Sequence, residues 1–194
     1  MEMSLELEIG FRQHPRVPAP DLIEISDDAV LAGAARDGNR AAFARLYDRY
    51  SRMVHGILLS KVPHGDVDDL VQDVFLLALK RIHTLRNASS FGGWLAMIAR
   101  HRAADYHRAA TEVTELTEDL ESRNSPEDEA ILILAAIRSL PDAYRETLIL
   151  RLVEGMTGPE IAERTGLTPA SVRVNLHRGM KHLRDRLERR SIHE

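Results

Sequence analysis

The sequence predicts an all-α protein with two small helical domains joined by a flexible acidic linker, the second domain containing a helix-turn-helix. Three observations support this fold class. Leu, Ala, Arg and Glu are abundant, whereas aromatic residues make up 5% of the 194 residues, and this mixture favours helix over sheet. Apolar residues recur at spacings of three and four, and no segment alternates convincingly as a strand does. A polar, acidic tract separates two such regions at residues 111–125.

The first predicted domain, residues 26–110, contains four helices with clear boundaries. Gly38 ends the first helix, and Asn39 caps the second, whose apolar residues share one face. After a Pro-His-Gly break, Asp66 caps a third helix with its own apolar stripe. The fourth helix spans about residues 91–108.

The second predicted domain, residues 126–189, is equally well punctuated. Ser125 and Pro126 begin a very apolar helix, which Pro141 stops. The next helix ends at Gly155, a left-handed terminator. Outside the two domains we expect a loose N-terminal extension at residues 1–25, the acidic linker, and a short tail at residues 190–194.

Residues 157–183 have the pattern of a helix-turn-helix. A capping box starts a short helix, Ala162 permits close approach of the two helices, and Gly166 permits the sharp turn between them. Residues 173–190 hold seven Arg or Lys against two acidic residues. This charge favours a second helix that enters the major groove of DNA, although an ordinary helical hairpin is the alternative.

Residues 91–108 combine the only Trp of the chain with Tyr, His and Arg. Aromatic rings stack on unpaired bases, and Arg neutralises phosphate, so this mixture suits single-stranded nucleic acid. A structural role is the alternative for individual side chains. Trp94 and Tyr106 could belong to the core, and Asp105 could pair with a neighbouring Arg.

Composition excludes several other classes of function. The chain has no Cys, which excludes disulfides and Cys-containing zinc sites and fits a cytoplasmic location. The longest apolar run, residues 130–137, is far shorter than the roughly 20 residues of a membrane span, so we expect no membrane insertion. The Asp cluster of residues 66–82 lacks the spacing of a metal site, and no phosphate-binding loop or zinc-protease motif occurs. We therefore expect no catalytic residue, no metal and no cofactor.

Four blocks of the chain follow one another in a familiar order. They are AAFARLYDRY, DDLVQDVFLLAL, FGGWLAMIARHRAADYHR and LPDAYRETLILRLVEGMTGPEIAERTGLTPASVRVNLHRGMKHLRDRL. Together they resemble bacterial RNA polymerase sigma factors of the extracytoplasmic-function (ECF) group, and the resemblance covers residues 28–187. It implies a region-two domain, a linker and a region-four domain. It also implies a promoter-specificity subunit, which helps core polymerase to open the duplex and catalyses nothing itself.

The resemblance assigns roles to the segments described above. The helix at residues 66–82 is expected to dock on the clamp helices of the largest polymerase subunit through Asp69, Gln72 and Asp73. The segment at residues 91–108 is expected to melt and read the minus-ten element through Trp94, Arg100, His101, Arg102, Tyr106 and Arg108. The last helix is expected to read the minus-thirty-five element through Ser171, Arg173, Val174, Asn175, His177, Arg178 and Lys181.

The resemblance also implies further partners, namely the flap region of core polymerase, promoter DNA and an anti-sigma factor. The chain departs from the family at a few recognition positions, such as His101, where the family often has Asn. Two alternatives remain. A stand-alone helix-turn-helix regulator would bind duplex DNA without polymerase, but it has no need for the DDLVQD helix. A helical adaptor that binds no DNA is disfavoured by the basic last helix.

Overall fold

The computed structural model describes residues 27–111 and 126–191. The predicted extension at residues 1–25 and the linker beyond Thr111 lie outside the described residues. The described part is all-α, as predicted, and it contains no strand. Its α-helices are α1 (Asp27–Arg36), α2 (Arg40–Leu59), α3 (Val67–Arg81), α4 (Phe91–Thr111), α5 (Pro126–Arg138), α6 (Asp142–Leu152), α7 (Gly158–Thr165) and α8 (Pro169–Ser191).

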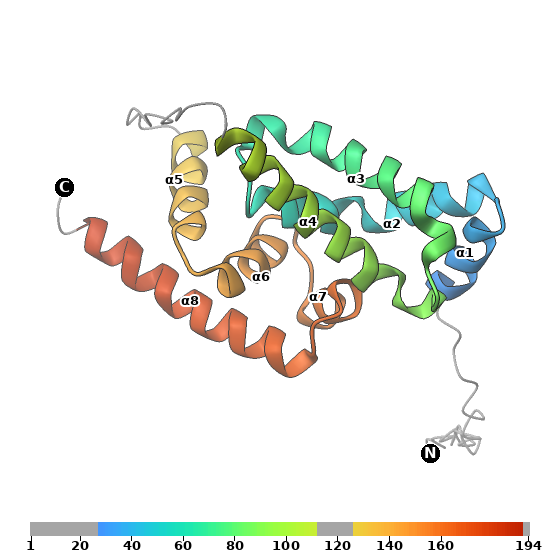
Figure 1. Cartoon of the computed structure of the whole chain (residues 1–194). Helices are drawn as coiled ribbons and strands as arrows, with labels where there is room; N and C mark the ends of the chain where they lie inside the picture. The colour runs from blue at the N-terminus through green and yellow to red at the C-terminus, as the bar shows by residue number, and fades with distance from the viewer. Residues whose placement is uncertain (1–26, 112–125, 192–194) are drawn as a thin grey trace, which may run out of the picture.

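Helices α1 to α4 form a first helical unit, with the inward faces of α2, α3 and α4 at its centre (Figure 1). Asn39 caps α2 as predicted, because its side-chain oxygen accepts a hydrogen bond from the Ala42 N–H at 3.1 Å. Asp66 occupies the N-cap position of α3 but makes no side-chain cap. Its carboxylate instead accepts a hydrogen bond from the Tyr106 hydroxyl of α4 at 2.7 Å. The fully buried side chains of this unit include Leu46, Met53, Ile57, Phe91 and Leu95.

Helices α5 to α8 form the second unit, and the predicted capping box is present at the start of α7. The Thr157 N–H donates to the Glu160 carboxylate at 2.8 Å, and the Glu160 N–H donates back to the Thr157 hydroxyl. The Glu160 carboxylate accepts hydrogen bonds from both the N–H and the hydroxyl of Thr157, and these two bonds lower the pKa of Glu160. Gly166 ends α7 with a φ of 75°, a conformation that disfavours any side chain. The helix-turn-helix therefore has the local geometry that the sequence predicts.

The two units pack directly against each other. Figure 1 shows α6 and α7 lying beneath α2 and α4; α2 contacts both α6 and α7, and α4 contacts α7. The buried apolar residues of both units belong to one continuous core, to which α6 contributes Leu148, Ile149 and Leu150. No pattern in the sequence predicted this contact. Within the described residues, no helix combines the length and the apolar character of a membrane span.

Candidate nucleic-acid and polymerase interfaces

Helix α8 is the candidate reader of duplex DNA, and its inner face is anchored on α6. Val172 and Leu183 are buried. A side chain added at Gly179 would approach Leu148 to 3.0 Å, so α8 and α6 lie very close at this point. The start of α8 is fixed by Thr168, whose hydroxyl accepts a hydrogen bond from the Ser171 N–H at 3.1 Å. Because one face of α8 packs against α6, its opposite face points outward.

The outward face of α8 carries most of the residues predicted to read the minus-thirty-five element. Six of the seven are exposed, namely Ser171, Arg173, Val174, His177, Arg178 and Lys181. Arg173, His177 and Lys181 are four residues apart, so they form one line along the helix. Among the described residues, no carboxylate forms an ion pair with Arg173, Arg178 or Lys181. These three cations are available to phosphates and base edges.

Asn175 is the exception among the seven predicted residues. It is half-buried and lines a cavity of about 270 Å³ at the seam between the two units. Arg100 of α4 and Glu146 of α6 line the same cavity. In this arrangement Asn175 does not share the exposed face of its neighbours.

The residues predicted to bind the minus-ten element fall into two groups. The first group lines a cavity of about 350 Å³ between α3 and α4, with an apolar part formed by Leu77 and Ile98. Three Arg side chains, Arg81, Arg102 and Arg108, also line it, together with His101 and Asp105. An apolar hollow with a cationic border suits an unstacked base between two phosphates. Sequence analysis missed Arg81, although a basic residue in the last turn of a helix that packs on α4 was a usable signal.

The second group of predicted minus-ten residues lies elsewhere. Tyr106 is half-buried, and its hydroxyl donates a hydrogen bond to the Asp66 carboxylate. Trp94 is half-buried against Phe91, with ring centroids 5.8 Å apart. Arg100 donates two hydrogen bonds to the Glu146 carboxylate, at 2.6 and 3.1 Å, and these raise the pKa of Arg100. The structure thus brings three of the six predicted residues into one cavity and leaves the other three in packing or pairing roles.

Carboxylates neutralise the cations of α4. Arg102 forms an ion pair with Asp73 of α3 at 2.5 Å, and Arg108 pairs with Asp105 of its own helix. Asp73 is a predicted polymerase contact and Arg102 a predicted DNA contact. One ion pair therefore joins the two predicted surfaces.

The predicted polymerase-docking face of α3 has an apolar half that sequence analysis did not identify. Asp69 and Gln72 are exposed as expected. Leu76 and Leu79 continue the same line of the helix and remain 55% and 45% exposed. Two exposed Leu side chains beside polar groups are typical of a protein-docking surface. In the described residues, no cluster of acidic or His side chains could hold a metal ion.

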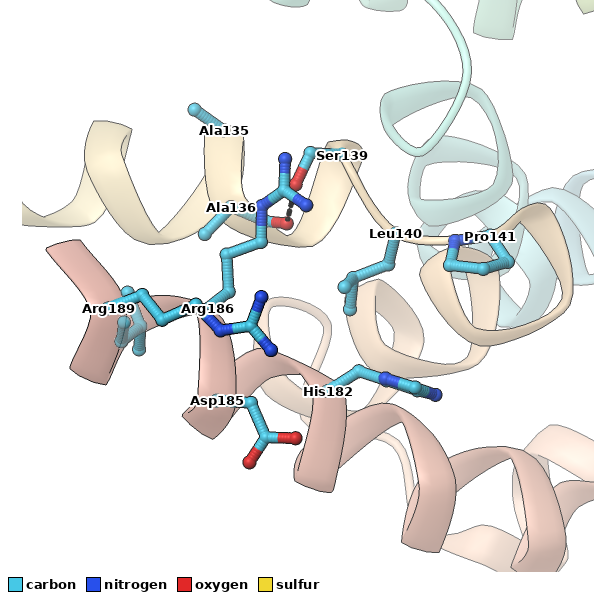
Figure 2. Close-up of a pocket in the computed structure, with 10 residues that line it drawn as sticks. Ala135, Ala136, Ser139, Leu140, Pro141, His182, Asp185, Arg186 and Arg189 are labelled. Atoms are coloured by element: carbon cyan, nitrogen blue, oxygen red, sulfur yellow. Dashed lines mark hydrogen bonds between the residues drawn. The ribbon is translucent and has the colours of Figure 1, made fainter.

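A groove of about 800 Å³ separates α5 from the C-terminal half of α8 (Figure 2). Its apolar lining includes Ala135, Ala136 and Leu140, which come from α5 and the turn after it. Arg186 and Arg189 project from α8 toward α5, and Asp185 lies beside them (Figure 2). His182 stacks on Tyr144, with ring centroids 5.4 Å apart. The shape and lining of this groove suit an amphipathic helix of another protein.

Comparison with known proteins assigns both units. Residues 46–112 match the Sigma-70 region 2 family, and residues 130–183 match Sigma-70 region 4. The ECF RNA polymerase sigma factor BldN of Streptomyces coelicolor is 33% identical over 184 residues, which cover 87% of this chain and 68% of BldN. The chain belongs to the ECF sigma factors. As members of this family do, it recognises promoters and initiates transcription with RNA polymerase.

Two further similarities extend this assignment of the sigma factor. The ECF RNA polymerase sigma-E factor of Haemophilus influenzae is 27% identical over 180 residues, which cover 83% of this chain and 95% of that protein. The solved structure of CnrH in complex with the cytosolic domain of CnrY matches 83% of this chain and 97% of CnrH. The sequence identity is 26% and the TM-score is 0.60. Region 2 of this sigma factor thus contains α3 and α4, and region 4 contains the helix-turn-helix.

Proposed function

We propose that this sigma factor divides its work among three surfaces and catalyses no reaction. The α3 face docks on core polymerase, the α3–α4 cavity takes the opened minus-ten strand, and the outer face of α8 reads the minus-thirty-five duplex. The observation that carries this proposal is that Arg173, Arg178 and Lys181 are exposed on α8 and form no ion pair with any carboxylate among the described residues. Because polymerase acts on chromosomal DNA, we infer a cytoplasmic location.

The docking surface on α3 consists of Asp69, Gln72, Leu76 and Leu79, with Asp73 at its border. When a partner covers exposed Leu side chains, the complex is stabilised by about 25 cal/mol for each square ångström of apolar area buried. The carboxylates and the amide then fix the register of the partner helix. A basic or polar helical partner, such as the clamp helices of the largest polymerase subunit, fits this combination.

The reading surface on α8 separates sequence recognition from general attraction. A bidentate Arg contact with guanine is worth about 1–3 kcal/mol of discrimination, whereas a phosphate contact strengthens binding to every sequence alike. Arg173 lies nearest the N-terminus of α8, the end that enters the groove in helix-turn-helix proteins. We therefore infer that Arg173 contacts base edges and that Lys181, two turns farther on, contacts phosphate.

The α3–α4 cavity is our proposed site for the opened minus-ten strand. His101 and Arg108 are exposed at its mouth, and Leu77 and Ile98 offer an apolar surface to a base. Arg81 adds a cation from the opposite helix. In this proposal Tyr106 and Trp94 support the cavity by packing, while the three cations and His101 hold the strand.

The α5–α8 groove is our proposed site for the flap region of polymerase. Its lining on α8 begins at His182, beyond the predicted reading residues, so both contacts can form together. The CnrH structure contains the cytosolic domain of a second protein, CnrY. This likeness supports an anti-sigma factor as a further partner of the present chain.

Run-off transcription with purified core polymerase tests the proposed function. A library of promoter fragments should yield discrete transcripts only when both proteins are present. The double variant D69K/D73K should lose association with core polymerase in a co-purification assay while its helical content stays unchanged. D37K, an exposed carboxylate outside all three surfaces, is the matched control. Unchanged association of a folded D69K/D73K protein would remove the α3 assignment.

A further inference from the structure

The outer face of α8 carries one large apolar side chain among its cations. Val174 is 42% exposed, whereas Val172 and Leu183 of the same helix are buried. Single exposed apolar residues are common on protein surfaces and need no special explanation. Val174 differs from such residues in its position, because its neighbours on this face are the exposed cations of the proposed reading surface.

Helix geometry places Val174 between these cations. Successive residues of an α-helix lie about 100° apart around its axis, so Arg178 is about 40° to one side of Val174. On the other side runs the line of Arg173, His177 and Lys181, which are four residues apart. Among the described residues, no carboxylate forms an ion pair with the Arg and Lys side chains of this set. When the cations on both sides approach DNA, the residue between them faces the base edges at the floor of the groove.

The contacts of α8 hold Val174 in one position. At the start of the helix, the Ser171 N–H donates a hydrogen bond to the Thr168 hydroxyl at 3.1 Å. Farther along, a Cβ at Gly179 would lie 3.0 Å from Leu148 of α6, so the helix packs closely on its support. A Val side chain in a helix has one strongly preferred χ1 rotamer. The methyl groups of Val174 therefore form a fixed apolar surface on the outer face.

The next residue of the helix, Asn175, does not share this face. In the major groove, an Asn side chain pairs with adenine through two hydrogen bonds. Asn175 is half-buried, and it lines the cavity shared with Arg100 and Glu146 instead. One turn before Val174, Ala170 is exposed and is also apolar. Ala170 and Val174 thus form an apolar strip along the first half of α8.

The C5 methyl of thymine is the apolar group that the major groove of DNA presents. Other base edges offer hydrogen-bonding groups, which an apolar side chain would cover without pairing. We propose that the strip of Ala170 and Val174 recognises a thymine of the minus-thirty-five element through its C5 methyl. The inference rests on the proposed function, because it requires the outer face of α8 to lie in the major groove of that element.

Replacement of thymine by deoxyuridine tests this inference, because it removes the C5 methyl and leaves the hydrogen-bonding edge unchanged. The preferred minus-thirty-five duplex is first selected with the holoenzyme from a library of upstream elements. Each thymine of this duplex, on either strand, is then replaced by deoxyuridine in turn. Burial of one methyl group corresponds to about fourfold in affinity, so we expect at least one replacement to weaken holoenzyme binding by roughly this factor. Equal affinity for the parent duplex and every deoxyuridine duplex would overturn the inference.

The V174A variant assigns the effect to Val174. It removes two methyl groups from an exposed position, and Ala favours helix, so circular dichroism should show an unchanged fold. The matched control is V30A in α1, where Val30 is 57% exposed and lies outside the proposed surfaces. We expect the loss of affinity on deoxyuridine replacement to fall below about twofold in V174A and to stay at about fourfold in V30A. An unchanged loss in a folded V174A protein would overturn the inference.

The wild-type holoenzyme distinguishes failure of the inference from failure of the proposed function. If its transcription does not depend on the upstream element at all, the proposed function fails, and the inference fails with it. If transcription depends on that element but every deoxyuridine duplex is bound as tightly as the parent duplex, only the thymine contact is withdrawn.

Discussion

Helices α4 and α8 are both rich in cations and both predicted to bind DNA, yet their surroundings differ. On α8 the cations Arg173, Arg178 and Lys181 have no carboxylate partner among the described residues. On α4, Arg100, Arg102 and Arg108 are each held by a carboxylate. In our proposal, the α8 surface can therefore bind DNA directly, whereas the cations of α4 must first exchange their carboxylate partners for DNA.

This comparison accounts for the distribution of charge along the chain. A net charge of −4 gave no indication of a DNA-binding protein. The acidic residues Asp73 and Glu146 contribute to that balance, and both neutralise α4 in the folded chain. We therefore expect the free chain to bind promoter duplex weakly and to need core polymerase for specific binding. Tight, sequence-specific binding by the free full-length chain would contradict this expectation.

Forcing the contact between the two helical units open should have the largest effect. In G92A the added methyl would meet the Arg164 carbonyl oxygen at 2.6 Å and the Tyr50 ring at 2.9 Å, and such overpacking costs about 1–3 kcal/mol. We expect a lower melting temperature and a larger open fraction by distances between spin labels at R40C and V153C, one exposed site in each region. G33A is the matched control, because nothing lies within 4 Å of that position in α1. An unchanged melting temperature for G92A would show that the seam is looser than described.

The next largest effect is expected on DNA affinity when an unpaired Arg of α8 is removed. R173A should weaken binding to the preferred upstream duplex and flatten the preference among variant duplexes. The loss of about 1–3 kcal/mol corresponds to roughly five- to 150-fold in affinity. Fluorescence anisotropy with the holoenzyme and a matrix of upstream-element variants measures it. R36A, exposed at the end of α1, should have no effect. If R173A lowers affinity for all sequences equally, Arg173 contacts phosphate rather than bases.

On α4, where carboxylates pair with the Arg side chains, removing a carboxylate should increase DNA binding rather than decrease it. D73N should release Arg102, so the free chain should bind a single-stranded oligonucleotide more tightly. Exposed ion pairs are worth about 0–1 kcal/mol, so the gain is at most roughly fivefold. D68N, an exposed carboxylate on the same helix without an ion pair to Arg102, serves as control. Identical affinities for D73N and D68N would show that the pair does not restrain Arg102.

The smallest expected effect is a pH dependence of seam closure through His55. The hydrogen bond to Glu154 raises the pKa of His55 in the closed chain, and Asp68 adds attraction. Arg52 also lies near Glu154. Because the pKa is raised on closure, this contribution is complete below the ordinary His pKa of about 6.5 and is lost as the pH rises through the raised value. The spin-label distances should show a falling closed fraction on that rise. H55N should remove this dependence, and an unchanged pH profile for H55N would exclude the His55 contact as its cause.

Local features of the fold could be predicted because local residues determine them. Asn39 caps α2, and Gly38, Gly155 and Gly166 all have positive φ values at the ends of helices, as expected. Short-range rules for caps and terminators apply wherever the tertiary structure does not compete with them. Asp66 shows the competition, because its carboxylate accepts a hydrogen bond from Tyr106 rather than capping α3.

The candidate site was harder to predict, since long-range pairing determines it. Arg100 and Glu146 are 46 residues apart, and His55 and Glu154 are 99 apart. No periodicity or spacing relates such pairs. The apolar stripe of α3 was recognised from its pattern, but the exposure of Leu76 and Leu79 depends on which faces α2 and α4 cover. The sequence therefore identified the segments that carry the predicted residues, but not which of those side chains are exposed and which are paired.

The distance between region 2 and region 4, measured before and after core polymerase binds, tests most directly whether their contact opens. Spin labels at R40C and V153C on the full chain provide it without knowledge of the promoter sequence. The two promoter elements are named for positions about 25 base pairs apart, which is roughly 85 Å at 3.4 Å per base pair. We therefore predict one short distance in the free sigma factor and a longer distance, by tens of ångströms, in the holoenzyme. The same short distance in both states would contradict the expected opening of this contact.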